Sequence, residues 1–165
     1  MLKSMRFGIA AALALVIGAG AQGQGEKGKV HGPDGEHIVA RPETIQWGPA
    51  PPGLPAGATA AILLGDPGKA VPYVIRAKMP DGYKVPPHWH PTDENVTVIQ
   101  GTLMVGKGEA FNASASEPLP TGSYMRMPKE MRHFAWAKGE TIIQVHGIGP
   151  FEINYVNPKD DPRKK

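Results

Sequence analysis

Three histidines and one glutamate stand at spacings that suit a shared metal ion. His88 and His90 are two residues apart, so on a strand both imidazole rings lie on one face, one pleat repeat apart. Glu94 follows four residues later, although Pro91–Asp93 interrupts the extended chain, so parity alone places it weakly. His133 is distant in the sequence and can reach the same ion from a neighbouring strand. Together they offer three nitrogen ligands and one oxygen ligand.

This ligand set predicts a particular class of metal and of chemistry. Three imidazoles and one carboxylate favour a divalent first-row transition metal, because Ca²⁺ and Mg²⁺ prefer oxygen ligands. The chain has no cysteine, so any metal site must use histidines and carboxylates. Four protein ligands leave two positions open on a metal that prefers six, and open positions indicate catalysis. A doubly charged ion with one carboxylate leaves a net charge of about +1, which favours a small anionic ligand such as a carboxylate or an enolate.

The segments that must position these residues read as short strands. Each is bounded by Gly, Pro or Asp, and many are β-branched or aromatic. Turn signals separate several of them, and no window shows the apolar spacing of a helix. About eight strands in about 100 residues predict an all-β sandwich or barrel. The expected strands are Ile62–Leu64, Tyr73–Met79, Asn95–Gln100, Thr102–Val105, Tyr124–Met127, His133–Ala137, Thr141–His146 and Glu152–Val156.

The first 21 residues resemble a secretory signal peptide. Lys3 and Arg6 form a charged start, Phe7–Ile17 is an apolar and glycine run, and Ala19–Ala21 has the small-x-small form of a cleavage site. The run is too short to span a bilayer as a helix, which disfavours the alternative of an uncleaved membrane anchor. We therefore expect an exported protein, periplasmic or secreted.

The rest of the chain of 165 residues suits one domain with two tails. Residues 22–41 are glycine-rich with few large apolar side chains, and we expect a flexible, largely disordered segment. Residues 42–156 should form the β-barrel domain, with the proline-rich stretch Pro42–Pro55 packed on it through Trp47. Residues 157–165 read as a charged tail.

The overall charge points away from nucleic acid. The sequence pI is about 9.2 and the formal net charge is +3, but loss of Lys3 and Arg6 with the signal peptide leaves about +1. The basic cluster Arg163–Lys165 is expected to be solvated. We expect no nucleic-acid partner, no membrane association after signal cleavage, and a small, anionic substrate. A homodimer is left open.

The glycines around the first three candidate ligands complete a longer pattern. The sequence has Gly82, then His88, His90, Glu94 and Gly101, with five, one, three and six residues between successive members. This spacing resembles the first motif of the cupin superfamily at every position. Glycine at each end suits a turn that reverses the chain, because it adopts positive φ at no steric cost.

A second motif resembles the cupin pattern in part. Gly122 is followed by Pro128, Glu130, His133 and Ala137, with five, one, two and three residues between them. Cupins usually have glycine where Glu130 stands and asparagine where Ala137 stands. His133 holds the position of the fourth metal ligand. The resemblance covers Val71 to about Val156.

The resemblance implies a single cupin-type antiparallel β-barrel of jelly-roll form, with one metal near an end of the barrel. It implies His88, His90, Glu94 and His133 as ligands of Mn, Fe, Ni, Cu or Zn. Many such cupins are dioxygenases, decarboxylases or isomerases. We therefore expect an exported metalloenzyme, a dioxygenase-type oxidoreductase acting on a small oxygen-rich or carboxylated molecule. A redox-neutral lyase or isomerase, and a binding module without turnover, are the alternatives.

Other residues carry weaker expectations. His146 either lines the pocket or is an ordinary strand histidine. Phe134 and Trp136 have opposite parity to His133 and should face away from the metal. Tyr124 and Glu130 are candidates for a general acid or base, against the simpler interpretation of a strand or turn residue. The residues expected to fill the core are Tyr83, Trp89, Val96, Val98 and Met104.

Overall fold

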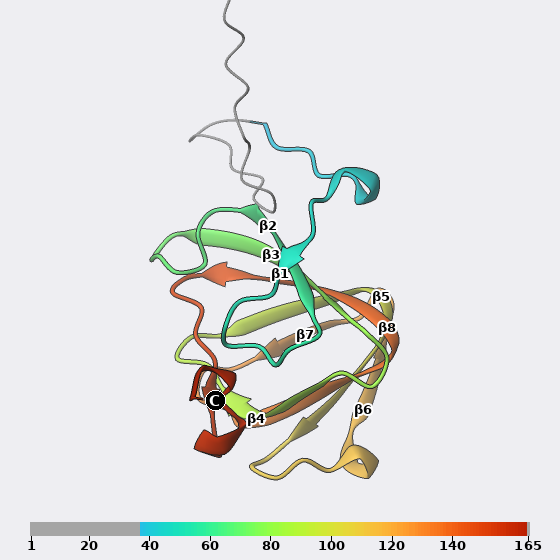
Figure 1. Cartoon of the computed structure of the whole chain (residues 1–165), viewed down its shortest axis with the longest axis vertical. Helices are drawn as coiled ribbons and strands as arrows, with labels where there is room; N and C mark the ends of the chain where they lie inside the picture. Colours follow the sequence, from blue (N-terminus) through green and yellow to red (C-terminus); the bar gives the residue numbers. More distant parts are fainter. Residues whose placement is uncertain (1–36, 165) are drawn as a thin grey trace, which may run out of the picture.

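The structure, a computed structural model, describes residues 37–164 and is an all-β, curled antiparallel sheet (Figure 1). The predicted signal peptide and residues 22–36 lie outside this range. Short 3-10 turns lie at Pro42–Thr44, Ala113–Ala115, Pro158–Asp160 and Pro162–Lys164. The strands are β1 Gly48–Pro49, β2 Thr59–Leu64, β3 Pro72–Met79, β4 Lys84–Trp89, β5 Glu94–Lys107, β6 Glu117–Pro120, β7 Tyr124–Met127, β8 His133–Ile148 and β9 Asn154–Tyr155.

Two long strands organise the sheet. The hydrogen-bonded order is β1-β2-β3-β8-β4-β9, and β5 pairs with β6, β7 and β8, all antiparallel. The first part of β8 pairs with β4 and its later part pairs with β3, while β5 follows it along nearly its whole length. Because β8 curls, it brings β3, β4 and β5 around one interior (Figure 1). The predicted all-β, antiparallel barrel architecture is confirmed.

The length of these strands corrects the sequence reading at two glycines. The sequence predicts a reversal at Gly101 and a break between the strands His133–Ala137 and Thr141–His146, where Gly139 lies, but β5 and β8 run through both positions. Gly101 has φ +77 and Gly139 has φ +75. At Gly101 the register of β5 on β8 shifts. Positive φ at a bulge bends a strand without ending it, so these glycines curve the sheet. Gly82, with φ +72, does lie in the turn between β3 and β4, as expected.

The interior of the curled sheet is the main hydrophobic core. Val96 and Val98 are each 1% exposed in it and Tyr83 joins them, as expected. Met104 is buried outside this cluster. Trp89 is not core: it is half-buried on the opposite side of β4, with the Arg132 guanidinium 6.0 Å from its ring. The alternation of β4 explains this, since it turns the flanking histidines inward.

A second, smaller cluster lies where the proline-rich segment meets the sheet. Trp47 packs there with Ile45, Ala61 and Leu63, and Lys78 Nζ lies 4.5 Å above the Trp47 ring. The expectation that this segment packs through Trp47 is confirmed. Its short strand β1 adds backbone hydrogen bonds to β2, which the sequence did not reveal.

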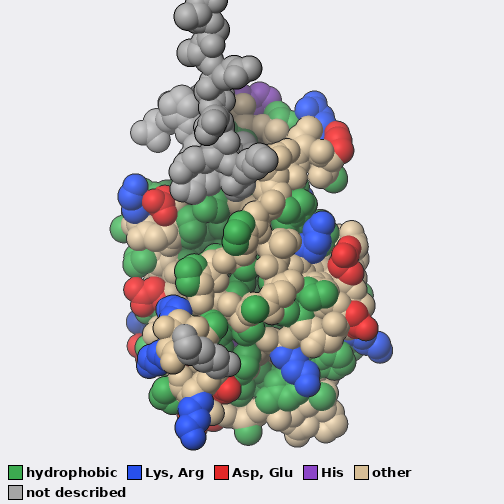
Figure 2. All heavy atoms as spheres, viewed as in Figure 1, with side chains coloured by type: hydrophobic (Ala, Val, Ile, Leu, Met, Phe, Trp, Pro, Cys, Tyr) green, Lys and Arg blue, Asp and Glu red, His purple; other side chains and the backbone are tan. Residues whose placement is uncertain are grey.

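The C-terminal residues differ from the solvated tail expected from their composition. Asp161 is buried, and the Arg163 guanidinium donates to its carboxylate and to the backbone carbonyl of Ile153. The ion pair satisfies the buried carboxylate, so a charged stretch can pack against the domain. On the face in Figure 2, basic side chains are dispersed among acidic and apolar ones. Within residues 37–164 there is no helix long and apolar enough to cross a membrane.

Candidate metal centre

Strand β4 delivers two histidines to the interior. His88 lies in β4 and His90 follows its last residue, and both are buried while Trp89 between them faces outward. Their ring centroids are 5.0 Å apart. The two-residue spacing therefore places both imidazoles on one side of the chain, as alternation predicts.

The third histidine comes from the start of β8. His133 is 1% exposed and pairs directly with His88 in the register between β8 and β4, with ring centroids 4.2 Å apart. The turn before it passes through Glu130, which has φ +63. This is the conformation that glycine supplies at the family position, so the turn is kept despite the different residue. Glu130 also donates its backbone N–H to the carbonyl of His90.

Glu94 begins β5 and faces the same interior. Its Oε2 lies 3.5 Å from His90 Nε2 and 3.4 Å from His133 Nε2. The loop before it is held by Asp93, whose carboxylate accepts hydrogen bonds from the Lys129 backbone N–H and the Arg126 guanidinium. The hydrogen bond from the Lys129 backbone lowers the pKa of Asp93 most, and the bonds from Arg126 lower it further. Asp93 thus ties the loop carrying Glu94 to the loop before His133, a role that no sequence signal indicated.

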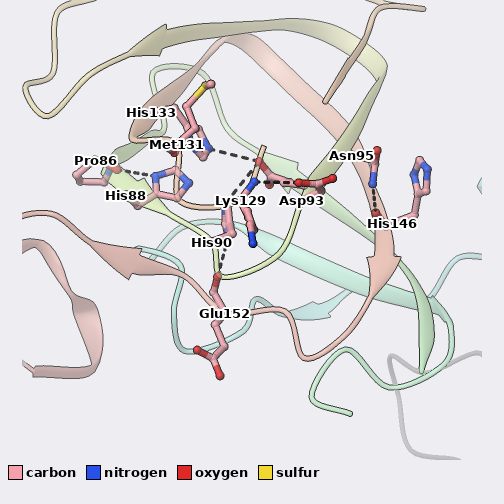
Figure 3. Close-up of polar contacts among 11 residues, drawn as sticks. Pro86, His88, His90, Asp93, Asn95, Lys129, Met131, His133, His146 and Glu152 are labelled. Atoms are coloured by element: carbon pink, nitrogen blue, oxygen red, sulfur yellow. Dashed lines mark hydrogen bonds and ion pairs between the residues drawn. The ribbon is translucent and has the colours of Figure 1, made fainter. Parts of the chain in front are cut away.

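A backbone carbonyl orients the imidazole of each of the three candidate ligands, His88, His90 and His133 (Figure 3). The ring Nδ1 of His88 lies 2.7 Å from the Pro86 oxygen. The Nδ1 of His90 lies 2.6 Å from the Glu152 oxygen, and that of His133 lies 3.0 Å from the Met131 oxygen. Since a carbonyl only accepts, each Nδ1 carries the proton and donates. Each Nε2 therefore has a free lone pair turned inward, as in metal-binding histidines.

These inward atoms fit one cation. One ligand atom from each of His88, His90 and His133 lies within 4.8 Å of the others. Neighbouring nitrogens on one ion are about 3.0–3.4 Å apart at typical bond lengths and angles, so the three rings would draw closer together around a bound ion. His90 Nε2 is buried without a hydrogen-bond partner. Lone pairs facing the Glu94 carboxylate repel it unless a proton or a metal ion lies between them, and this donor set suits a transition metal.

The site is held in the protonation states that metal binding needs. Burial, together with the other two imidazoles, lowers the pKa of His88 to about 3, so this ring is neutral near pH 7. Burial also lowers the pKa of His90. Burial alone raises the pKa of Glu94, but its interactions with His133, His90 and His88 outweigh burial and lower the pKa to about 2. The carboxylate is therefore ionised.

The four side chains line one wall of a small internal cavity. Its volume is about 60 Å³, and apart from these four residues every lining side chain is apolar. The apolar wall comes from several strands and includes Ile75, Val96, Leu103, Met125, Val145 and Phe151. The cavity therefore has one polar end, formed by the three histidines and Glu94, and is otherwise apolar.

Other candidates from the sequence lie outside this cavity. His146 does not line it and is an ordinary strand residue, because Val145 has the inward parity. Tyr124 is 58% exposed and donates to Asn95, so it has no access to the site. Phe134 packs on Phe111 with centroids 4.9 Å apart, facing away from the metal side as expected. Trp136 donates its ring N–H to the Ser116 hydroxyl. Glu130 lies in the turn before His133, where its backbone has positive φ.

The sequence reading missed the segment that closes the site from the C-terminal side. Phe151 stacks on the His90 ring, with centroids 4.9 Å apart and planes 19° apart. The next residue, Glu152, supplies the carbonyl that orients His90. An isolated Phe-Glu pair after a proline carries no pattern that points to a metal centre, so only the tertiary structure reveals it.

Comparisons with known proteins identify the fold. Residues 35–152 match the family described as the ChrR cupin-like domain. The polyketide cyclase RemF from Streptomyces resistomycificus is similar, with 16% identity over 78% of this chain and 92% of its own, and a TM-score of 0.61. An acetylacetone dioxygenase from Acinetobacter johnsonii gives 13% identity, coverages of 95% and 88%, and a TM-score of 0.57. KdgF from Halomonas sp. has 19% identity over 70% of this chain and 94% of its own, with a TM-score of 0.52. No curated protein matches significantly.

Proposed function

The chain belongs to the ChrR cupin-like domain family, and on that premise we propose that it is an exported, metal-dependent oxidoreductase of dioxygenase type. The observation that carries the proposal is the convergence of three inward imidazole Nε2 atoms and the ionised Glu94 on one apolar cavity. The ligands would be His88, His90, His133 and Glu94. A redox-capable divalent metal held by these residues would supply the Lewis-acid and electron-transfer chemistry that such a reaction needs.

The cavity lining defines the kind of substrate. No lysine or arginine is among the described residues that line the cavity, so the negative charge of a substrate would have to be offset by the bound metal ion. The remaining wall suits an aliphatic body. We infer a small molecule with one oxygen-bearing, ionisable end and an apolar remainder, such as a short carboxylate or a diketone enolate.

Cavity size limits the substrate and suggests its entrance. A volume of about 60 Å³ is well below the roughly 300–1,000 Å³ of ordinary ligand pockets. A larger groove of about 620 Å³ lies along β5, β6 and β7, and Met125 is the residue common to both linings. Methionine is flexible and adapts its shape readily. Movement of Met125 would therefore connect the groove with the metal end.

The absence of other proton carriers favours redox chemistry over a lyase or an isomerase. Among the described residues that line the cavity, only the four proposed ligands have side chains that can act as a general acid or base at neutral pH. A dioxygenase-type reaction depends less on a general acid or base. Both oxygen atoms of O₂ enter the substrate, which supplies the electrons, so no further reductant is required. Solved proteins of this fold include both a dioxygenase and a polyketide cyclase, and this feature of the cavity supports the proposal of dioxygenase chemistry.

Oxygen uptake tests the proposal. Metal-free protein would be loaded with Fe(II), Mn(II) or Zn(II) and supplied with short carboxylates and β-diketones, with His133→Ala as the control. We expect O₂ consumption with a redox-active metal and none with Zn(II) or with the variant. Turnover by the Zn(II) form without O₂ uptake would favour a lyase or isomerase. Binding without turnover throughout would favour a non-catalytic module.

Export is tested separately from catalysis. We propose that the mature chain begins at Gln22, after Ala21. N-terminal sequencing of the protein from the periplasm or the culture medium should give that start. Recovery of the whole chain from the cytoplasm, beginning at Met1, would contradict it.

A further inference from the structure

The hydroxyl of Tyr73 is buried without a hydrogen-bond partner. Tyr73 lies in β3 and is 1% exposed, and within residues 37–164 its oxygen meets no donor or acceptor. The other three tyrosines all donate, Tyr83 to Pro55 and Tyr155 to Gly53 among them. An unpaired buried hydroxyl is costly, so its presence points to a partner that is not part of the protein.

The phenol reaches toward the metal site across a glycine. Tyr73 pairs with Gly147 of β8 and has the same parity as Ile75, which lines the metal cavity. A Cβ on Gly147 would lie 3.3 Å from the Tyr73 oxygen, so the ring end lies directly over that glycine. Gly147 thus leaves the space that the phenol occupies.

The strand on the far side of Gly147 carries Glu94. In the pairing of β5 with β8, Asn95 lies opposite His146 and Val96 opposite Val145. Continuing this register by one residue brings Glu94 level with Gly147. Tyr73 and Glu94 therefore belong to one row across three strands, and the hydroxyl extends over the middle strand toward the carboxylate.

Two further observations link this hydroxyl to the site. The Tyr73 ring contacts Phe151, with centroids 5.7 Å apart, and Phe151 stacks on His90. Burial raises the pKa of Tyr73, and the charge of Glu94 raises it further. The two groups therefore interact electrostatically without a hydrogen bond between them. The hydroxyl remains protonated at neutral pH and is available as a donor.

We propose that the Tyr73 hydroxyl donates a hydrogen bond to a small anionic ligand bound beside Glu94 at the metal end of the cavity. This inference rests on the proposed metal site and names the residue that selects ligands presenting an acceptor atom there. Such a donor compensates for the lack of basic side chains in the cavity lining.

Azide binding to the Co(II)-loaded protein tests this role, because visible absorption reports an anion that joins the metal. Tyr73→Phe removes only the hydroxyl. We expect azide to bind at least about 10-fold more weakly, as for loss of one hydrogen bond to a charged group. Cobalt content should be unchanged, and the melting temperature equal or higher, because an unpaired buried hydroxyl has been removed.

Two other variants separate this role from a structural one. Tyr83→Phe removes a hydroxyl that bonds Pro55; it should lower stability and leave azide affinity unchanged. Gly147→Ala should displace the Tyr73 hydroxyl and weaken azide binding without loss of cobalt. Azide affinities within twofold of wild type for both Tyr73→Phe and Gly147→Ala would overturn the inference alone. Failure of the wild-type protein to take up cobalt would refute the metal site and the inference together.

Discussion

Acid should destabilise the metal-free protein through His88, because this ring is held neutral in the fold. Its pKa is about 3 in the folded chain against 6.5 for an ordinary histidine, with burial as the largest cause. Below pH 6.5 the unfolded chain takes up a proton that the folded chain does not. Stability is therefore full above pH 6.5 and is lost as the pH falls toward about 3. Each pKa unit corresponds to about 1.36 kcal/mol, so the total loss from His88 is about 5 kcal/mol.

Urea unfolding of the EDTA-treated protein at pH 7, 6, 5 and 4 measures this loss. Between pH 6 and 4 the free energy of unfolding should fall by about 1.4 kcal/mol for each pH unit from His88 alone. Glu94, whose pKa is lowered to about 2, adds its own loss below about pH 4.5. His88→Gln should make the dependence above pH 4.5 shallower and leave the part due to His90, whose pKa is also lowered by burial. The matched control His146→Gln, at a histidine outside the cavity, should retain it. Equal pH dependence for His88→Gln and wild type, or a folded His88 that titrates near 6.5 by NMR, would refute the reasoning.

Three further changes test the ligand set, the entrance and the packing. Glu94→Gln keeps an oxygen donor but removes the charge, so calorimetry should show weaker and less pH-sensitive metal binding; equal affinity would argue against Glu94 as a ligand. Met125→Ala should admit benzoate to the Co(II)-loaded protein more readily than wild type, while the volume-conserving Met125→Leu should not; unchanged binding in both would exclude this entrance. Gly106→Ala would place a Cβ 2.1 Å from Phe134 Cζ and should cost about 1–3 kcal/mol in urea unfolding; an unaffected stability would show that the ring can move aside.

Two of the candidate ligands could be predicted from the sequence because their spacing matches the alternation of side chains along a strand. The two-residue interval between His88 and His90 gives one face directly. Glu94 and His133 needed the cupin motifs, since neither parity nor proximity in the sequence places them. The structure brings His133 opposite His88 through strand pairing, a long-range relation that no local pattern encodes.

The limits of the prediction follow from the same distinction. Gly101 and Gly139 were read as reversals because positive φ serves turns and bulges alike, and only the continued pairing of β5 and β8 separates the two. The Tyr73 hydroxyl and the carbonyl of Glu152 act through contacts between distant segments. Such contacts depend on the folded register, which composition and periodicity do not specify.

Metal stoichiometry tests the central claim most directly. Elemental analysis of the wild-type protein after loading and desalting should find one divalent transition metal ion per chain. His133→Ala and His90→Ala should retain almost none, while His146→Ala, outside the cavity, should retain one. Equal metal content in all four proteins, or none in the wild type, would contradict a metal centre at these histidines.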